Sequence, residues 1–173
     1  MKRHPEFAIM ATEWFRVYDA ASPVWLEIDP GASFAVEDIT GSLAVSNPIC
    51  HSSAMMRKAP IIGVGGYDEA RRFVFDYDLW ARSAAAGLRL GRIQLPLVAK
   101  RIHPGQQFLH SGPLRYRLAG FQLRLQAMRL LGVRMRDIPI IGLRFVWILL
   151  PLRVRHTVTK IGAGRRIGKI RLR

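Results

Sequence analysis

Two aspartates, Asp76 and Asp78, stand two residues apart in the segment FDYDLWAR, which follows a Gly-Gly pair. A carboxylate can remove the proton of a hydroxyl group while its oxygen attacks an electrophile, and such general base catalysis contributes about 10²–10⁴-fold to a rate. At 3.6 residues per turn, the two positions are separated by about 200° around a helix. The carboxylates are therefore predicted to point in different directions and not to form a paired acid site.

The residues from Asp76 to Ala86 are predicted to form the helix that positions these carboxylates. Asp76 is a favourable N-cap, and Gly87 is favourable just beyond the C-terminus of a helix. Backbone N–H groups and the helix dipole keep a carboxylate at this end ionised. By this local rule Asp76 is an N-cap, and Asp78 is a first-turn charge that complements the dipole.

The remaining elements upstream of residue 103 are predicted from periodicity and turn residues. Residues 1–20 are predicted to be a short helix, because five large apolar residues recur at roughly helical spacing. Residues 49–56 are predicted to be a strand, and residues 57–64 a short helix that ends at a Gly-Gly turn. Residues 88–102 are predicted to be two extended segments that meet at Pro96.

The C-terminal part is predicted to be helical and basic. Residues 114–135 are predicted to form a long amphipathic helix, with an apolar stripe at Leu118, Phe121, Leu125, Met128 and Leu130 or Leu131. Residues 138–152 are strongly apolar, but a spanning helix needs roughly twenty such residues. We therefore expect an interfacial or re-entrant segment, followed by an arginine-rich tail.

The positive charge of the chain is concentrated in this C-terminal part. Residues 1–99 hold ten Lys or Arg and eleven Asp or Glu, whereas residues 100–173 hold seventeen Lys or Arg and a single acid, Asp137. Such an excess predicts a polyanionic neighbour, either an anionic membrane surface or nucleic acid. The tail lacks interleaved aromatic residues and the chain lacks a nucleic-acid-binding signature, which favours the membrane. The single cysteine, Cys50, excludes an internal disulfide framework.

Four short motifs occur in order between Asn47 and Gln107, namely NPICHSSAMMRK, VGGYDE, FDYDLWAR and RIHPGQQ. In this order and spacing they resemble the C-terminal, acceptor-side half of bacterial family-2 glycosyltransferases. The resemblance covers about sixty of the 173 residues. It implies an α/β fold, a partial Rossmann-like A-type glycosyltransferase fold with a short mixed sheet and flanking helices, to which a C-terminal basic, partly apolar helical extension is added.

The resemblance also implies roles for individual residues. Asp76 corresponds to the general base that deprotonates the acceptor hydroxyl, although this chain has Phe75 where the family usually has another acid. Acceptor-binding roles are implied for His51, Gly66, Tyr67, Asp68 and Trp80. Contacts with the donor diphosphate are implied for Arg101 and His103.

Simpler structural roles remain open for the same residues. His51 is also interpretable as a hydrogen-bonded core residue, and Trp80 as a core residue. The Gly65-Gly66 pair fits a turn that requires positive φ. Arg101 and His103 are interpretable as solvated side chains of a strand end and a loop.

The donor-binding half of the family has no counterpart upstream of Asn47. Its D-x-D motif, which follows a strand and holds a divalent metal ion (Mg²⁺ or Mn²⁺), is expected for the family but is absent upstream of Asn47. Asp76-Tyr77-Asp78 has the same letters but lies in the other half, so no metal-ligand motif of the family is assigned to this chain. We therefore expect residues 1–46 to be a lead-in or remnant, residues 47–112 to be the acceptor-side half-domain, and residues 113–173 to be the basic helical region.

The resemblance implies transfer of a hexosyl group from a nucleotide sugar to a glycan or lipid-linked acceptor, in bacterial cell-envelope polysaccharide synthesis. A partner chain would supply the donor half, and the protein would be cytoplasmic, at the inner face of the cell membrane. The alternative is a non-catalytic, truncated fragment that binds a membrane surface or a partner enzyme through its basic C-terminal region.

Overall fold

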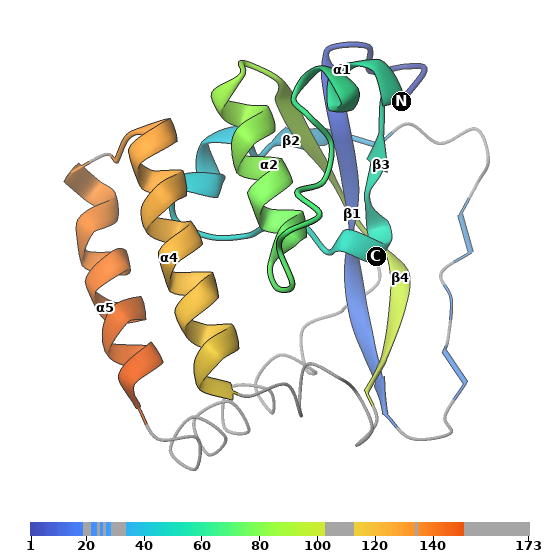
Figure 1. The fold of residues 1–173 in the computed structure, drawn as a ribbon. Coiled ribbons are helices and arrows are strands. Elements are labelled where there is room, and N and C mark those ends of the chain that lie inside the picture. Colours follow the sequence, from blue (N-terminus) through green and yellow to red (C-terminus); the bar gives the residue numbers. More distant parts are fainter. Residues whose placement is uncertain are drawn as a thin grey trace. The chain divides into compact units, whose positions relative to one another are not determined.

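The computed structural model describes residues 1–18, 22–23, 25, 27–28, 34–102, 113–133 and 135–150. The chain divides into two compact units, Met1–Val133 and Arg134–Arg173. The first unit contains a small four-stranded mixed sheet with flanking helices (Figure 1). The predicted α/β class is therefore confirmed, and the arrangement is consistent with a partial Rossmann-like fold.

Two long strands form the centre of the sheet. β1 (Phe7–Tyr18) and β4 (Arg89–Ile102) pair in parallel, and the short strands β2 (Val36–Asp38) and β3 (Met55–Met56) pair antiparallel at the two edges. The strand order is β2-β4-β1-β3. Because β1 and β4 are parallel, their carboxyl ends lie together at the same end of the sheet.

The predicted helix over residues 1–20 is wrong, because β1 occupies most of this segment. The five residues from Phe7 to Ala11 are all buried. A strand covered on both faces has a continuous apolar run and loses its period-two alternation. The large residues farther along, among them Trp14 and Phe15, then imitate helical spacing by coincidence.

β4 is one strand, although two extended segments were expected around Pro96. Its pairing with β1 is irregular there: Thr12 pairs with Ile93, Glu13 with Pro96 and Trp14 with Val98. Proline has no N–H group to donate to a ladder, and a bulge accommodates it without ending the strand.

The helices of the first unit agree in part with expectation. The predicted helix over residues 57–64 is confirmed, whereas the predicted strand over residues 49–56 contains a 3₁₀ turn and only two strand residues. The helix that carries the aspartates ends where predicted, with Gly87 at φ +81°. The elements are η1 (Thr40–Ala44), η2 (His51–Ser53), α1 (Lys58–Gly63), α2 (Phe75–Ala85) and α4 (Pro113–Leu131).

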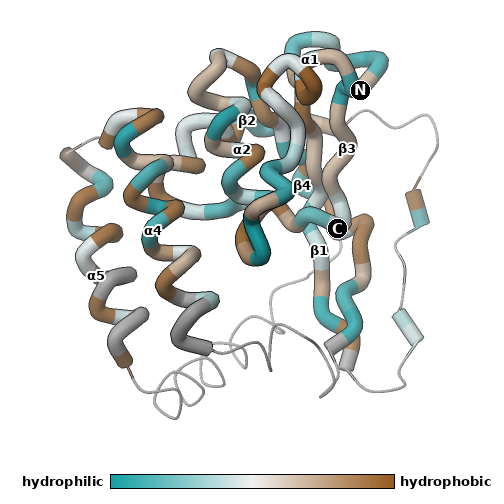
Figure 2. The backbone as a smooth tube through the Cα atoms, viewed as in Figure 1, coloured by the Kyte–Doolittle hydropathy of each residue, from teal (hydrophilic) through white to brown (hydrophobic). Residues whose placement is uncertain are grey.

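The apolar stripe predicted for α4 is partly displaced. Met128 is buried and Leu131 packs against the core, as predicted, and Leu123 and Ala127 are buried as well, whereas Leu118 and Leu125 are exposed. The reason is that α4 packs on α2 and η1, and these neighbours determine which side of the helix is covered. Figures 1 and 2 show α4 beside α2, with hydrophobic and hydrophilic segments alternating along both helices.

The compact units differ from the expected division of the chain. Residues 1–46, expected to be a lead-in or remnant, provide the central strand β1 and the edge strand β2. The boundary expected at residue 113 is absent, since α4 contributes to the core of the first unit. The division between compact units falls between Val133 and Arg134.

The second unit contains η3 (Met135–Asp137) and α5 (Ile138–Leu149). Asp137 is the N-cap residue of α5, and proline follows in its first turn, a position where proline is tolerated. Among the residues that the structure describes, no helix is both long enough and apolar enough to span a membrane.

Candidate functional site

α2 begins one residue earlier than predicted, so Asp76 is not its N-cap. The N-cap is Val74, whose backbone is left-handed with φ +51°. A β-branched residue rarely adopts this conformation, which costs of order 1–3 kcal/mol and occurs most often at functional sites. The strained turn places Phe75 and Asp76 together at the start of the helix.

The carboxylate of Asp76 is held by two donors. Its Oδ1 accepts a hydrogen bond of 2.8 Å from the backbone N–H of Tyr77, and its Oδ2 accepts one of 3.4 Å from the side-chain amide of Asn47. The residue is partly exposed. Asp76 thus has oxygen lone pairs available beyond these two contacts.

The same carboxylate lines a cleft with a volume of about 280 Å³. The walls come from β1, the segment before β3, the start of α2 and the end of β4, with the lining residues Trp14, Asn47, Pro48, Ile49, Cys50, His51, Ser52, Asp76 and Lys100. A concave site with a few convergent polar groups is typical of a small-molecule binding site. We call it the Asp76 cleft.

A cluster of aromatic rings borders the Asp76 cleft at His51. The His51 Nε2 and the Tyr67 hydroxyl are 2.8 Å apart. The ring of Phe75 contacts both of these rings edge to face, at centroid distances of 5.7 and 5.9 Å. The predicted site residues His51 and Tyr67 are therefore brought together, and Phe75, the first residue of α2, contacts both rings.

Trp80 supports this cluster from beneath. Its side chain is completely buried, and its ring lies 6.0 Å from that of His51. The structure therefore places Trp80 in the core and does not expose its side chain to a ligand in the Asp76 cleft. The alternative interpretation, a core residue, agrees with its burial.

Two tyrosines are influenced by the charge of Asp76. Burial raises the pKa of Tyr67 above its ordinary value of 10.0, and the Asp76 carboxylate raises it further. The pKa of Tyr116, on α4, is raised by the same two causes in the same order. A phenol is protonated at neutral pH even at its ordinary pKa, so both can act as hydrogen-bond donors, and the raised pKa values extend this to higher pH.

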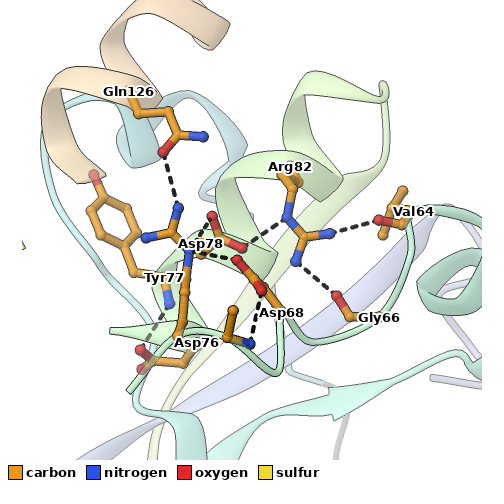
Figure 3. Close-up of polar contacts among 10 residues, drawn as sticks. Val64, Gly66, Asp68, Asp76, Tyr77, Asp78, Arg82 and Gln126 are labelled. Carbon is orange, nitrogen blue, oxygen red and sulfur yellow. Dashed lines mark hydrogen bonds and ion pairs between the residues drawn. The ribbon is translucent and has the colours of Figure 1, made fainter. Parts of the chain in front are cut away.

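Asp78 lies on the other side of the helix and is buried (Figure 3). Its carboxylate accepts a hydrogen bond of 2.8 Å from Nε of Arg82, and its other oxygen lies 3.1 Å from Nε of Arg71. The predicted separation of the two aspartates is confirmed. The burial of Asp78 and its two arginine partners were not predicted, and one of them, Arg71, precedes the helix.

Arg82 connects Asp78 to the turn that carries Tyr67. Its two terminal nitrogens donate to the backbone carbonyls of Val64 and Gly66, at 2.6 and 2.7 Å (Figure 3). Gly66 has φ +61°, as the Gly-Gly turn requires. The role of Gly66 in this geometry is thus to shape the turn and to accept a hydrogen bond.

Asp68 is occupied within its own loop. Its carboxylate accepts a hydrogen bond from the backbone N–H of Ala70 at 3.1 Å and lies 3.3 Å from Nε of Arg71. Asp68 does not line the Asp76 cleft. The structure thus gives Asp68 a turn-stabilising role, separate from the group formed by His51, Tyr67 and Asp76.

Lys100 and Trp14 form the wall of the Asp76 cleft contributed by the long strands. Arg101, predicted to contact phosphate, is the next residue of β4. Successive side chains of a strand point to opposite faces of the sheet, so Arg101 points away from the face that carries Lys100. Lys100, and not Arg101, is therefore the cationic residue of β4 that lines the Asp76 cleft. His103 lies outside the described residues.

Sequence reasoning missed Trp14, Lys100 and Tyr116 as neighbours of Asp76. Each is remote from residue 76 in the chain and comes from a different element, so no local motif contains them. Asn47 belonged to the first motif, but its hydrogen bond to Asp76 was not predicted. A weak signal for Lys100 existed in the period-two alternation next to Arg101.

The described residues place a candidate general base in the cleft but no cluster of metal ligands. Within them, no group of three or more His, Cys, Asp or Glu side chains is placed to hold a metal ion. Asp76 can instead accept a proton from a hydroxyl group in the cleft, with Asn47 fixing the orientation of the carboxylate. Comparisons with known proteins give no match to any family model, curated protein or solved structure.

Proposed function

We propose that this chain is the acceptor-side part of a glycosyltransferase that moves a hexosyl group from a nucleotide sugar to a glycan or lipid-linked acceptor. In this proposal Asp76 is the general base. It removes the proton from the acceptor hydroxyl as the oxygen attacks the anomeric carbon, and the nucleotide diphosphate leaves with the electron pair of the broken bond.

The observation that supports the proposal is the position of Asp76 in the Asp76 cleft. A sugar hydroxyl is a weak nucleophile, so a carboxylate within hydrogen-bond reach accelerates its attack. Asn47 and the N–H of Tyr77 orient the carboxylate, and the pair formed by His51 and Tyr67 offers further hydrogen-bonding groups to a sugar ring.

We assign no donor-binding site to the described residues of this chain. We propose that another polypeptide segment supplies the residues that bind the nucleotide and the divalent metal ion expected for such enzymes. The metal would neutralise charge on the leaving diphosphate. Calorimetry should accordingly detect no binding of a UDP-sugar or Mn²⁺ to the isolated chain, and micromolar binding would contradict this division of labour.

Deletion of the gene from the cells that carry it tests the proposed function. Membranes of the deletion strain should lose incorporation of labelled hexose from a mixture of nucleotide sugars into envelope glycan or lipid. The wild-type gene should restore it. Unchanged incorporation with every nucleotide sugar would contradict a role in glycosyl transfer.

A second proposal concerns location. Within the C-terminal unit, α5 exposes Ile140, Leu143 and Val146, which lie three residues apart and so share one side of the helix. The C-terminal sequence carries a large excess of arginine. We propose that this unit attaches to the anionic inner surface of the cell membrane, with or without catalysis by the rest of the chain.

Flotation of the protein with lipid vesicles tests this attachment. The protein should float with vesicles that contain phosphatidylglycerol and less with vesicles of phosphatidylcholine alone. Replacing Leu143 by Asp should weaken flotation, because a charge then enters the apolar side of α5. Equal flotation with both vesicle types, or tight binding to DNA in a parallel gel shift instead, would contradict the proposal.

A further inference from the structure

We propose that the Asp76 cleft binds a phosphorylated sugar, with the phosphate at Lys100 and a ring hydroxyl at Asp76. The identity of this ligand as an acceptor rests on the proposed function, whereas the anion-binding site itself rests on the geometry of the two long strands. It adds a substrate class, and a residue that selects it, to the general base chemistry.

The cationic wall is built by the carboxyl ends of β1 and β4. Arg16 and Lys100 are directly paired across these parallel strands, and Trp14 lies two residues before Arg16, on the same face. Lys100 Nζ and Arg16 Cζ lie 5.4 and 5.5 Å from the centre of the Trp14 ring. Both cations are thus attracted to the ring and held at the edge of the sheet.

The position of this wall favours a ligand. In open α/β sheets, ligands bind outside the carboxyl ends of parallel strands, and β1 and β4 are the parallel pair of this sheet. Lys100 and Trp14 both line the Asp76 cleft, and the indole is 37 % exposed. An ammonium group next to an accessible aromatic surface suits a ring that carries an anionic substituent.

Asp76, on the opposite wall of the cleft, determines the orientation of the ligand. Asp76 repels an anion and accepts hydrogen bonds from hydroxyl groups, whereas Lys100 attracts the anion. A neutral sugar would satisfy only the Asp76 side. A ligand with hydroxyls at one end and phosphate at the other is complementary to both walls, and this complementarity orients it.

The size of the cleft limits the ligand. Its volume of about 280 Å³ is just below that of typical ligand pockets, which span about 300–1,000 Å³. One sugar ring with a phosphate suits this space better than a nucleoside diphosphate. UDP therefore serves as the probe that separates a donor-type site from the site proposed here.

Indole N–H resonances in NMR spectra of the ¹⁵N-labelled full chain test this site, with Trp14 assigned by Trp14→Phe. Glucose 1-phosphate should shift the Trp14 resonance with a dissociation constant about tenfold or more below that of glucose, since hydrogen bonds to charged groups contribute about 1.5–3 kcal/mol. Inorganic phosphate should compete. Binding of UDP more tightly than glucose 1-phosphate would overturn the proposal.

Lys100 is the position to be tested, and its neighbour Arg101 provides the matched control. Lys100→Gln should abolish the preference for glucose 1-phosphate over glucose, and Lys100→Arg should keep it. Arg101→Gln removes the same charge from the other face of β4 and should leave the preference intact. Equal losses in Lys100→Gln and Arg101→Gln would mean general attraction to a basic protein and would overturn the proposal.

The outcome is separable from that of the proposed function. Equal affinity for glucose and glucose 1-phosphate overturns the phosphate site, while the gene-deletion assay still reports on glycosyl transfer. Conversely, a phosphate preference that depends on Lys100 supports this site even where the deletion strain keeps full transfer. Dispersed indole resonances in each variant show that it is folded.

Discussion

Asp76 and Asp78 are the same residue type in the same turn of α2, yet their surroundings differ in every physical respect. Asp76 is partly exposed, lines a cleft, and has an amide and a backbone N–H as its partners. Asp78 is 2 % exposed and lies against Arg71 and Arg82. Half a turn of helix therefore separates a carboxylate open to ligands from one that is part of the scaffold.

The buried pair of Asp78 and Arg82 also maintains the geometry of the Asp76 cleft. Arg82 is held by Asp78 and in turn binds the carbonyl of Gly66, directly before Tyr67. Tyr67 then contacts His51 at the border of the Asp76 cleft. The ion pair of Asp78 with Arg82 thus fixes the turn on which the position of Tyr67 depends.

The largest effect on stability is expected for Asp78→Asn. Removing one partner of a buried ion pair costs about 3–5 kcal/mol when the other charges remain, and the partial exposure of both arginines places the expected loss near the lower bound. The free energy of unfolding in urea, followed by circular dichroism, measures this. A loss below about 1 kcal/mol, as typical for surface sites, would show that Asp78 is not structural.

A smaller loss is expected for Arg82→Lys. Lysine keeps the charge but cannot donate simultaneously to Asp78 and to the carbonyls of Val64 and Gly66, so about 1–2 kcal/mol should be lost. The Tyr67 ring resonances should change as the turn loosens. Arg89→Lys, at an exposed ion pair with Asp38, is the control and should be nearly neutral; an equal loss there would remove the distinction.

The tyrosines near Asp76 should affect stability at high pH. The raised pKa values of Tyr67 and Tyr116 mean that the folded protein keeps these protons above pH 10.0, where the unfolded chain loses them. Their contribution to stability is therefore complete below pH 10.0 and is lost as the pH rises through the folded values.

Asp76→Asn should lower both tyrosine pKa values, because it removes the nearby negative charge. The change should be partial, since burial is the larger cause of both shifts. Ultraviolet titration of the phenolates measures it, with Asp68→Asn as the control. Identical titration curves for the wild type and Asp76→Asn would place the carboxylate too far from both rings.

Local signals predicted the elements that are determined locally. The helix α2 and its end at Gly87 were predicted from turn chemistry and periodicity, as was the Gly65-Gly66 turn. The N-cap was not, because the left-handed Val74 is fixed by packing against the core and not by residue preference. A favourable cap at Asp76 was therefore the wrong inference from a correct rule.

Non-local packing explains the other differences. β1 has no strand alternation over Phe7–Ala11, since both faces are covered, and its pairing with β4 and β3 identifies it as a strand. α4 buries Leu123 and Ala127 because α2 and η1 lie there. Trp14 and Lys100 approach Asp76 only through the sheet, so the half of the site that they form could not be predicted.

Glycosyl transfer by cells that express Asp76→Asn in place of the wild-type chain shows whether Asp76 acts as the general base. Asparagine matches aspartate in shape but cannot accept a proton, so transfer should fall by about 10²–10⁴-fold, while the urea midpoint stays at the wild-type value. Asp68→Asn should retain transfer. Near-wild-type transfer by a folded Asp76→Asn protein would contradict the assignment of Asp76 as the base.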